Sequence, residues 1–443
     1  MPKLFSKLKS FSGGIHPTEY KNLTSHLPFE TLPTPAKVVL PLSQHLGAPA
    51  IPVVAKRDEV FAGQLIAEQN GPISVPIYSP VSGKVLNIAS EDSVSSFPKE
   101  SITIKCDEEF QITNLPAMDI ESISAKEIRD RVQLAGIVGQ GGAAFPTYFK
   151  LTPPKDKEID YVILNGCECE PYLTRDYRFM IEFPEYLIKG LKLCMKALNV
   201  EKGAIGIENN KPDAIRVLLN ATKDDKSIKI ITLNTKYPQG AEKMLIKAVL
   251  NREVPPGKLP LDVGVVIQNI GTAIAIYDSI KFGSPQITAA LTVSGLGIET
   301  PKNLIVPVGT PLIDILTFCG GIKEDAKRVV VGGPMMGTAQ HNLNAPIVKA
   351  TSGILVLTEK EINQYKETNC LRCGMCVDVC PLNLTPTKLA RLSQLQRYEE
   401  AEEIGIFTCM ECGTCSFTCP ANIPLVQWIA LGKKEISKIK KAG

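Results

Sequence analysis

The sequence predicts a multi-domain protein of the α/β and α+β classes, because it is long and because its residue pattern changes several times along the chain. Its 443 residues exceed what a single hydrophobic core usually organises. Short β-branched runs come first, strands alternating with helices follow, short strands return, and helices surround two cysteine-rich stretches at the end. We therefore expect four domains, at 1–115, 116–285, 286–348 and 349–443.

The composition is that of a soluble globular protein, with 44% hydrophobic and 21% charged residues. The formal charge of +3 gives no reason to expect a nucleic acid as a partner. No stretch reaches the roughly 18–20 apolar residues of a membrane span, and the basic N-terminus lacks the apolar region of a signal peptide. We expect a protein of the reducing cytoplasm, where thirteen cysteines indicate metal or redox chemistry.

The first domain is expected to contain a small all-β unit between residues 36 and 107, where short β-branched runs are separated by turn signals. The segments "VFAGQLIAE" and "YSPVSGKV" resemble the barrel-sandwich fold of lipoyl and biotinyl carrier domains. The modified lysine of such carriers usually lies beside Met or Ala, whereas Lys84 follows "VSG". The resemblance therefore implies a structural unit rather than a lipoylated one.

The second domain has the alternation of a layered α/β fold with a largely parallel sheet. Strands are expected at 160–166, 203–208 and 227–234, and helices at 124–136, 178–198 and 211–222. Residues 286–348 return to short strands and glycines without a catalytic cluster, which indicates a small α/β adaptor.

The last domain is expected to be helical around its cysteines. Thr385 is a candidate N-cap with Pro386 at the first helical position of a helix that continues through 388–404, and a second helix covers 424–441. The end of that second helix is rich in lysine, which is typical of a solvated helix end; docking to anionic lipid or to an acidic partner is the alternative.

Two cysteine runs, "CLRCGMCVDVCP" (370–381) and "CMECGTCSFTCP" (409–420), repeat one spacing. Cysteines three apart can turn their thiolates toward one iron–sulfur cubane, and a fourth cysteine followed by proline serves the other cluster, as in bacterial two-cluster ferredoxins. Two zinc sites are the alternative, but zinc gives no reason for Cys-Pro to occur twice. By the logic of this run, one [4Fe–4S] cluster is held by Cys370, Cys373, Cys376 and Cys419, and the other by Cys409, Cys412, Cys415 and Cys380.

Five cysteines lie outside these runs. Cys106, Cys194 and Cys319 are expected to be small buried apolar residues, whereas Cys167 and Cys169 lie within a motif that carries acidic residues.

A glycine-rich loop and an acidic motif indicate a ligand site in the second domain. In "GIVGQGGAAFPTYFK" (136–150), Gly139, Gly141 and Gly142 would let backbone N–H groups approach a phosphate or a flavin ring. In "ILNGCECEPYLTRDYR" (163–178), a strand ends near Asn165 and delivers Glu168 and Glu170 to the carboxyl edge of the sheet, where open α/β folds bind ligands. A solvated loop is the alternative for these acids.

The chain resembles the C subunit of the Rnf-type, ion-translocating ferredoxin:NAD oxidoreductase complex. The resemblance rests on "FSGGIHP", "GQGGAAFPT", "NGCECEPYLTRDYR", "YPQGAEKMLI", "VIQNIGTA" and both cysteine runs. The second domain is similar to the FMN- and NADH-binding subunit of respiratory complex I, and the third resembles a soluble-ligand-binding β-grasp module. The fourth is then an α-helical two-cluster ferredoxin domain.

The resemblance implies FMN, two [4Fe–4S] clusters and NAD(H) as substrate. Its FMN contacts fall on Gly139, Gly141, Gly142, Lys150, Asn165, Glu168, Tyr237, Gly240, Asn269 and Thr272. Phe145 and Glu170 would face the nicotinamide nucleotide. Where the complex I subunit has two adjacent Glu residues after its glycine, Ala241 replaces one of them, so that only Glu242 remains.

The resemblance further implies hydride exchange between NAD(H) and FMN, followed by single-electron steps through the clusters. Its partners would be the other subunits of a membrane complex, with ferredoxin reached through one of them, and its place the cytoplasmic face of the membrane as a peripheral subunit. The alternatives are a cobalamin reductase of bacterial microcompartments, which shares the flavin domain and cluster runs, and a structural adaptor that has lost its flavin.

Overall fold

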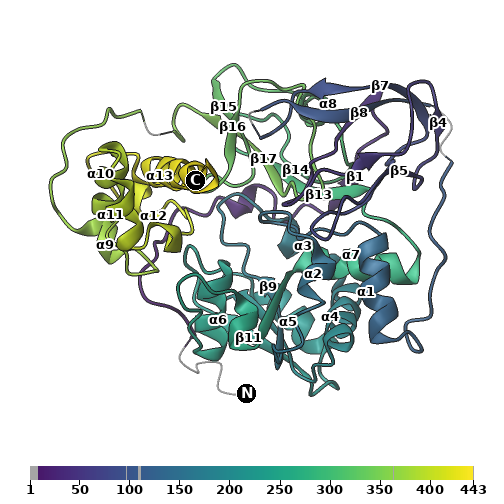
Figure 1. Cartoon of the computed structure of the whole chain (residues 1–443), viewed down its shortest axis with the longest axis horizontal. Helices are drawn as coiled ribbons and strands as arrows, with labels where there is room; N and C mark the ends of the chain where they lie inside the picture. The colour runs from purple at the N-terminus through teal and green to yellow at the C-terminus, as the bar shows by residue number, and fades with distance from the viewer. Residues whose placement is uncertain (1–7, 96, 108–110, 363, 443) are drawn as a thin grey trace.

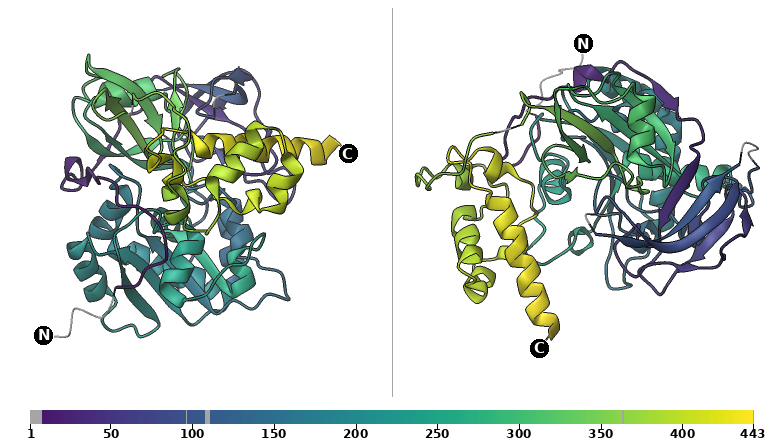
Figure 2. Two further views of the ribbon diagram at one scale, coloured as in Figure 1. Left: turned by 90° about the vertical axis from the view of Figure 1, so that its left-hand side faces the viewer. Right: turned by 90° about the horizontal axis from the view of Figure 1, so that it is seen from above.

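The computed structural model describes residues 8–95, 97–107, 111–362 and 364–442 (Figure 1). Three units, called here the barrel-sandwich domain, the parallel-sheet domain and the adaptor, lie against one another. The helical cysteine domain lies to one side of them, and the views in Figure 2 show it beside the adaptor and the parallel-sheet domain. Among the described residues, no helix combines the length and the apolar character that crossing a membrane requires.

The barrel-sandwich domain consists of two small sheets with the strand orders β2-β8-β7-β4 and β3-β5-β6. Its buried residues continue into the core of the adaptor, and this shared core includes Cys319, as expected for a small apolar residue. Lys84 lies within β7, opposite Glu59 on β4, and not at the tip of a hairpin. This position agrees with a structural role for the unit. The strands are β2 (Lys37–Pro41), β3 (Ile51–Pro52), β4 (Glu59–Val60), β5 (Leu65–Glu68), β6 (Ile77–Tyr78), β7 (Gly83–Glu91) and β8 (Lys99–Cys106).

The parallel-sheet domain has one four-stranded sheet, in the order β11-β10-β9-β12, and all its strands are parallel. The chain steps outward from β9 to β11 and then returns to place β12 on the other side of β9. The strand order therefore reverses between β9 and β12, and ligands of open α/β sheets bind at the carboxyl ends of strands flanking such a point. The strands are β9 (Tyr161–Gly166), β10 (Gly203–Glu208), β11 (Ile228–Leu233) and β12 (Val265–Asn269).

The helices of this domain cover the faces of the sheet. Helix α1 begins with a capping box, in which Ser124 and Glu127 bond to each other's backbone N–H, so it starts where the sequence predicts. The single helix expected over 178–198 is instead two helices, because Pro184 lacks the N–H that would continue the first. The helices are α1 (Ala125–Leu134), α2 (Thr147–Lys150), α3 (Arg175–Glu182), α4 (Pro184–Leu198), α5 (Pro212–Ala221), α6 (Glu242–Leu250) and α7 (Ile270–Lys281), with the 3-10 helix η2 (Pro260–Val263).

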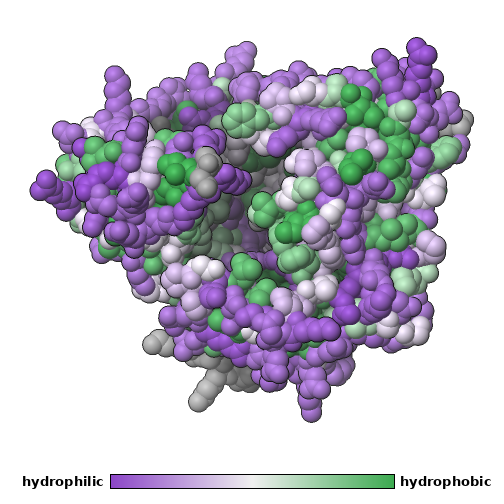
Figure 3. Space-filling view, viewed as in Figure 1, coloured by the Kyte–Doolittle hydropathy of each residue, from purple (hydrophilic) through white to green (hydrophobic). Residues whose placement is uncertain are grey.

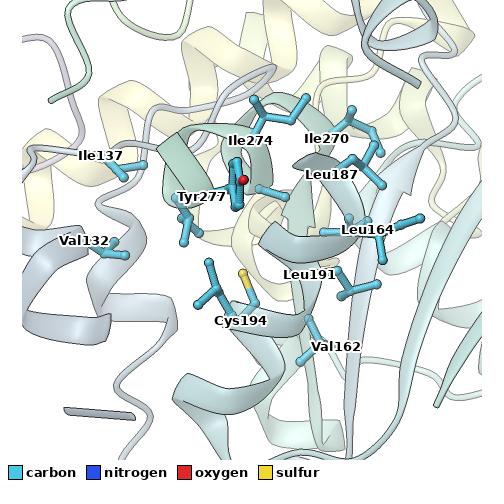
Figure 4. Packing of buried hydrophobic residues seen from close by; sticks show 14 of the residues in the cluster. Val132, Ile137, Val162, Leu164, Leu187, Leu191, Cys194, Ile270, Ile274 and Tyr277 are labelled. Atoms are coloured by element: carbon cyan, nitrogen blue, oxygen red, sulfur yellow. The ribbon is translucent and has the colours of Figure 1, made fainter. Parts of the chain in front are cut away.

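Helices α4 and α7 pack closely on the same face of this sheet (Figure 4). The interface contains Leu187, Leu191 and Tyr277, and the buried Cys194 lies among them as predicted. Gly190 allows the close approach, since a Cβ there would lie 2.0 Å from the carbonyl oxygen of Ala273.

The adaptor contains a six-stranded sheet in the order β1-β14-β13-β17-β15-β16, with α8 (Leu312–Phe318). Two of its strands come from outside the expected range of 286–348. Strand β1 pairs with β14, and β17 lies between β13 and β15, so the boundary expected at 349 cuts through this sheet. Sequence pattern missed this because the partners of these strands are distant in the chain. The strands are β1 (Phe29–Thr31), β13 (Thr288–Ser294), β14 (Lys302–Pro307), β15 (Ala326–Val331), β16 (Thr338–Gln340) and β17 (Gly353–Thr358).

The cysteine domain is helical, and its helices begin as predicted at Pro386 and near Leu425. The helix expected through residue 404 is interrupted, since Gln396 has a left-handed backbone with φ of 57° and divides it into α10 and α11. The elements are α9 (Met375–Asp378), α10 (Pro386–Gln394), α11 (Tyr398–Glu403), the 3-10 helix η3 (Ile406–Thr408), α12 (Thr414–Phe417) and α13 (Leu425–Ala442).

The lysines of α13 are largely engaged within the chain. Lys433 pairs with Glu411, Lys440 pairs with Glu402, and the ammonium of Lys434 lies over the ring of Phe97. These contacts agree with a structured helix end, and they leave fewer cations for a lipid surface than the sequence suggests.

Residues before β1 form an N-terminal segment that runs between the domains. Ile15 exchanges backbone hydrogen bonds with Tyr237 of the parallel-sheet domain, and Gly14 donates its N–H to the carbonyl of Val379 in the cysteine domain. The 3-10 helix η1 (Lys21–Leu23) follows. The segment thus joins two domains that are far apart in the sequence.

Lys349 lies where three domains meet, with only 1% of its surface exposed. Its ammonium donates to the carbonyls of Pro76 and Gly136, at 3.0 and 2.8 Å. Burial lowers the pKa of Lys349 from 10.5 to about 7, because no carboxylate compensates for the loss of water.

Replacement of Gly190 tests the packing of α4 on α7. We expect Gly190→Ala to lower the free energy of unfolding by about 1–3 kcal/mol or more, because the new methyl group meets the backbone of Ala273 and not a flexible side chain. Lys196→Ala, on the exposed face of the same helix, should change it by less than about 0.5 kcal/mol. Urea unfolding followed by circular dichroism measures both. Equal stability of the two variants would contradict this packing.

The burial of Lys349 predicts a dependence of stability on pH. Between about pH 7 and the ordinary pKa of 10.5 the unfolded chain binds more protons at this residue than the folded chain, so the unfolding free energy rises with pH. His45, whose pKa burial lowers, stays neutral in this window. Relative to Lys349→Met, the wild type should gain up to about 1.4 kcal/mol per pH unit between pH 7 and 9. The unfolding free energy of each protein is measured by urea unfolding at several pH values. If it varies with pH in the same way for both proteins, the lysine is not desolvated.

Candidate functional site

The glycine-rich loop lies at the carboxyl edge of the parallel sheet, beside the point where the strand order reverses. Its backbone closes on itself, because the N–H of Gly139 donates to the carbonyl of Phe145 at 2.8 Å. Gly141 is exposed and has φ of 74°, and a Cβ at Gly142 would meet no atom within 4 Å. The loop therefore presents bare backbone to an open space, which a ligand could approach closely.

A buried hydrogen-bond network fixes the loop over the start of α7. Asn269 caps this helix by accepting from the N–H of Gly271, and its side-chain amide donates to the carboxylate of Asp176 at 2.7 Å. Arg175 bonds to both Asp176 and Asn269, at 3.0 and 3.2 Å. Thr272 accepts the N–H of Gln140 at 3.0 Å. The predicted residues Gly141, Asn269 and Thr272 are thus brought together.

Arg175 and Asp176 are components of this site that sequence reasoning missed. Both are almost completely buried, so their charges must be paired within the protein. The signal was present in the segment "TRDYR", where an Arg-Asp pair directly follows the acidic motif.

Glu168 binds a helix terminus rather than the glycine loop. Its carboxylate accepts the backbone N–H groups of Asp176 and Tyr177, at 2.7 and 3.2 Å, and so caps the start of α3. Burial raises its pKa, against the opposing charge of Lys21. The ammonium of Lys21 donates to the carbonyls of Glu168, Glu170 and Leu173, at 2.8, 3.1 and 2.6 Å. Lys21, which no sequence motif predicts, therefore fixes the backbone of the loop that carries Glu168 and Glu170.

Lys150, which is predicted to contact FMN, forms an ion pair within the chain. Lys150, at the end of α2, contacts Glu242 at 2.5 Å and the carbonyl of Ile267 at 3.2 Å. This pair links α2 to the N-terminus of α6, where Ala241 occupies the N-cap position. Phe145 packs edge-on against the exposed Phe149. Lys150 and Glu242 thus lie together at one border of the site.

Asn165 connects β9 to the loop before α6. Its amide donates to the carbonyl of Gly240 at 2.7 Å, and the N–H of Gly240 points to the sulfur of Cys169 at 3.3 Å. A Cβ at Gly240 would lie 3.3–3.5 Å from the side chains of Cys169 and Asn165, which is a tight contact. The amide nitrogen of Gln268, beside Asn269, is buried and lacks a hydrogen-bond partner among the described residues. It is a further candidate contact for a bound group.

Tyr237 contacts the cysteine domain, and Glu170 contacts the adaptor. The buried hydroxyl of Tyr237 donates to the carbonyl of Cys412 at 2.8 Å. The carboxylate of Glu170 accepts the N–H groups of Met335 and Met336 of the adaptor, each at 3.0 Å. Burial raises the pKa of Glu170 to about 7, although these two N–H groups oppose the shift. The contact expected between Glu170 and the nicotinamide, and that between Tyr237 and the flavin, stay predictions.

Figure 3 shows that the surface is hollowed between the cysteine domain, the adaptor and the parallel-sheet domain. The hydroxyl of Tyr237 and the carbonyl of Cys412 join the parallel-sheet domain to the cysteine domain, which border this hollow.

Four cysteines surround one cavity in the cysteine domain, and they come from both runs. The lining of this cavity includes Cys380, Cys409, Cys412 and Cys415. No three histidines, cysteines or acidic residues of the described chain converge on the position of a single ion. Cys380 of the first run thus stands with three cysteines of the second, the grouping that the ferredoxin spacing predicts.

Three of the other four cysteines, Cys370, Cys376 and Cys419, lie near one another. Neighbouring thiols of Cys419 and Cys370 add to burial in raising the pKa of Cys376. Cys370 and Cys373 are exposed, whereas Cys376 is buried. Cys419 of the second run is thus near Cys370 and Cys376 of the first, as the spacing predicts, and this group lies closer to solvent than the first.

The two runs form an internal repeat with one backbone geometry. Arg372 and Glu411 each have a left-handed φ, of 57° and 58°, and each donates its N–H to the sulfur two residues earlier at 3.4 Å. Gly374 and Gly413 follow with φ of 80° and 82°, and each precedes a single helical turn. Backbone N–H groups directed at thiolate sulfur are typical of iron–sulfur loops.

These sites fit the groups that the sequence predicts. The thiols that the structure brings together from both runs are suitable donors for iron–sulfur cubanes. The bare backbone at Gly141 and Gly142 would allow a flavin to approach closely. The donor sets and the open loop are therefore those of a protein that carries both iron–sulfur clusters and a flavin.

Four family models match the chain in succession. The RnfC barrel sandwich hybrid domain matches residues 9–109, the Nuo51 FMN-binding domain 132–278, the SLBB domain 291–339 and the 4Fe-4S dicluster domain 369–424. They confirm the predicted multi-domain fold class, FMN and the two [4Fe–4S] clusters as cofactors, and an electron-transport role.

The fold is also similar to that of solved structures. A crystal structure of an NAD+-reducing [NiFe]-hydrogenase in the H2-reduced state aligns with a TM-score of 0.52 and 18% identity, over 69% of this chain and 65% of that chain. The air-oxidised state of the enzyme gives a TM-score of 0.50, over 74% and 66%. At this identity the likeness concerns the fold alone.

Several curated proteins are similar over most of their length. The chain is 48% identical over 398 residues to the C subunit of the proton-translocating ferredoxin:NAD(+) oxidoreductase complex of Clostridium ljungdahlii, which covers 89% of this chain and 87% of that protein. It is 44% identical over 436 residues to the C subunit of the Na(+)-translocating ferredoxin:NAD(+) oxidoreductase complex of Acetobacterium woodii, with 98% of each covered. It is 43% identical over 441 residues to the C subunit of the ion-translocating oxidoreductase complex of Rhodobacter capsulatus, covering 98% and 85%. The chain therefore belongs to the family of C subunits of Rnf-type ion-translocating ferredoxin:NAD(+) oxidoreductase complexes.

Proposed function

We propose that this subunit exchanges electrons between NAD(H) and a membrane complex, through FMN and then through its two clusters. The observation that carries the proposal is the contact between Tyr237 and Cys412, which joins the flavin-binding domain to a cluster loop within one polypeptide. Bound FMN would accept the hydride of NADH, which becomes NAD+, and release its two electrons singly, which is the form that an iron–sulfur cluster accepts. No side chain need act as an acid or a base.

The residues around the glycine loop would hold the flavin. Gly139, Gly141 and Gly142 would offer backbone N–H groups, and Asn165, Gln268 and Asn269 would offer side-chain amides at the carboxyl edge of β9 and β12. Glu168 would act as a positioning residue, because its carboxylate caps α3 and so fixes the Arg175–Asp176 pair that holds Asn269. Lys150 and Glu242 would border the site.

The order of the clusters follows from their surroundings. The set that includes Cys412 lies beside Tyr237, whereas the set that includes Cys370 and Cys373 lies at the exposed end of the domain. We place the Cys412 set next to the flavin and the Cys370 set at the exchange with other subunits. Ferredoxin would exchange electrons through such a subunit.

The subunit would then lie on the cytoplasmic side of the membrane as a peripheral component of an ion-translocating complex. The family of C subunits supports this, because its members are named for proton- and Na(+)-translocating complexes. The nicotinamide would approach the exposed face of the glycine loop, where Phe145 and Phe149 lie.

The reconstituted chain tests the function as a whole. With FMN and both clusters in place, anaerobic NADH should bleach the flavin absorbance and then reduce the clusters, as recorded by electron paramagnetic resonance. A loaded chain that stays oxidised under excess NADH would refute the proposal.

Replacement of Gly141 tests the flavin site. We expect Gly141→Ala to weaken FMN binding by roughly tenfold, because a methyl group would stand at a left-handed position beside Arg175 and Asn269. Gly321→Ala is a matched control, with φ of 95° and no atom within 4 Å, in the adaptor. Titration of flavin fluorescence measures both, and iron content monitors the rest of the fold. An equal loss of affinity in the two variants would place the flavin elsewhere.

Replacement of Cys380 tests the crossing of cluster ligands. A hydroxyl is a poorer ligand for iron than a thiolate, so Cys380→Ser should make the cluster held by Cys409, Cys412 and Cys415 labile. The double variant with Cys412→Ser should then still show one intact [4Fe–4S] signal by electron paramagnetic resonance, with about half of the iron, since both changes strike one cluster. Loss of both clusters in the double variant, but in neither single variant, would show that each run closes on itself.

A further inference from the structure

The two halves of the internal repeat share a backbone geometry but have different surroundings. The loop of the second run is covered by the rest of the chain. The carbonyl of Cys412 accepts the Tyr237 hydroxyl, and a Cβ at Gly413 would lie 3.0 Å from the carbonyl of Met335 in the adaptor. Met410, the residue after the first cysteine of this run, packs with Ile15 and Tyr237. This loop is thus the docking face of the cysteine domain for its flavin-binding neighbour.

The equivalent loop of the first run is uncovered. Leu371, which corresponds to Met410, is 67% exposed, and Met375, which corresponds to the fully buried Thr414, is 44% exposed. A Cβ at Gly374 would meet no atom within 4 Å. Val377 adds to the same exposed apolar surface. Exposed apolar side chains therefore flank the exposed thiols of this loop, whereas the corresponding residues of the other loop, Met410, Thr414 and Ser416, are buried or half-buried.

The charges of the two loops differ in the same way. Glu411 at the tip of the second loop pairs with Lys433 of α13, so its charge is satisfied within the chain. The corresponding residue of the first loop, Arg372, makes no ion pair with any residue of the part of the chain that is described. An acidic side chain would complement it.

We propose that the loop formed by residues 370–377 is a docking surface for a one-electron redox domain of another subunit. That domain would present an apolar socket for Leu371, just as the adaptor and the parallel-sheet domain pack against Met410 in the second loop. It would also present an acidic group for Arg372, just as Lys433 of α13 pairs with Glu411. The proposal rests on the proposed function, since it assigns the exit of the electron path. One electron would pass between the cluster of Cys370 and Cys373 and the partner's centre, so that one is oxidised as the other is reduced.

Binding measurements test this surface without depending on electron flow. The chain with both clusters is titrated onto the purified membrane complex that lacks this subunit, in wild-type form and as Leu371→Asp and Arg372→Glu. We expect each variant to bind about tenfold more weakly or worse, because an apolar anchor or a complementary charge is lost. Glutamate is compatible with the backbone at position 372, since Glu411 has the same φ in the other loop. Leu219→Asp, on α5 and 51% exposed, is the matched control and should bind as the wild type does.

Cross-linking identifies the occupant. A photoreactive benzoyl-phenylalanine in place of Leu371, in the assembled and purified complex, should attach to a subunit that carries a one-electron cofactor. Attachment to a second copy of this chain, to lipid or to a subunit without a redox centre would overturn the proposal. So would variants at 371 and 372 that bind no more weakly than Leu219→Asp, once iron content shows both clusters in place.

The two proposals can fail separately. If NADH does not reduce the flavin of the wild-type chain, the proposed function fails, whereas weaker binding of Leu371→Asp still supports the docking surface. If the function holds, both variants should keep wild-type flavin reduction by NADH and lose electron transfer to the complex by about tenfold or more at limiting concentration. Unchanged transfer would contradict the docking surface alone.

Discussion

The arrangement of this subunit depends on one buried contact, the hydroxyl of Tyr237 on the carbonyl of Cys412. A tyrosine in such a place needs a hydrogen-bond partner, and burial raises its pKa far above the ordinary value, so it stays a neutral donor. The same residue exchanges backbone hydrogen bonds with Ile15 of the N-terminal segment. Three segments that are distant in the sequence are thereby fixed around a cluster loop, and the flavin-binding domain and the cysteine domain keep one spacing.

Buried charges hold the acidic loop that faces this contact. Lys21 gives its ammonium to three carbonyls, and Lys211 pairs with Glu208 while also reaching the carbonyl of Cys167. Removing an ion from water costs several kcal/mol, and hydrogen bonds to the remaining donors and acceptors offset this cost. Displacement of the ammonium groups of Lys21 and Lys211 from these carbonyls would leave buried charges without hydrogen bonds. The loop from Cys167 to Leu173 is therefore rigid where it meets Tyr237.

The features that could be predicted from the sequence are those that short local motifs determine. The cysteine spacing predicted two thiol sets drawn from both runs, and the structure places Cys380 beside three cysteines of the second run and Cys419 near Cys370 and Cys376, because the spacing favours which thiols can meet. The glycine loop and Asn269 were also found from local motifs. The motifs named Tyr237 and Glu170 but did not predict their contacts with the cysteine domain and the adaptor, since a motif states which residues occur and not which domain packs over them. Arg175 and Lys21 were missed for the same reason, as was β17, whose partners are far away in the chain.

The unequal burial of the two cluster loops has an electrochemical consequence. Reduction adds a negative charge to a cluster, and removal of water disfavours that charge, so solvent exposure is one determinant of cluster potential. Cys412 and Cys415 lie in a buried loop, and no partner can change their hydration greatly. Cys370 and Cys373 are exposed, and a domain that covers Leu371 would remove water from them. Docking would then shift the reduction potential of the outer cluster and leave the potential of the inner cluster unchanged. Assembly of the complex would thus itself adjust the driving force of the final electron step.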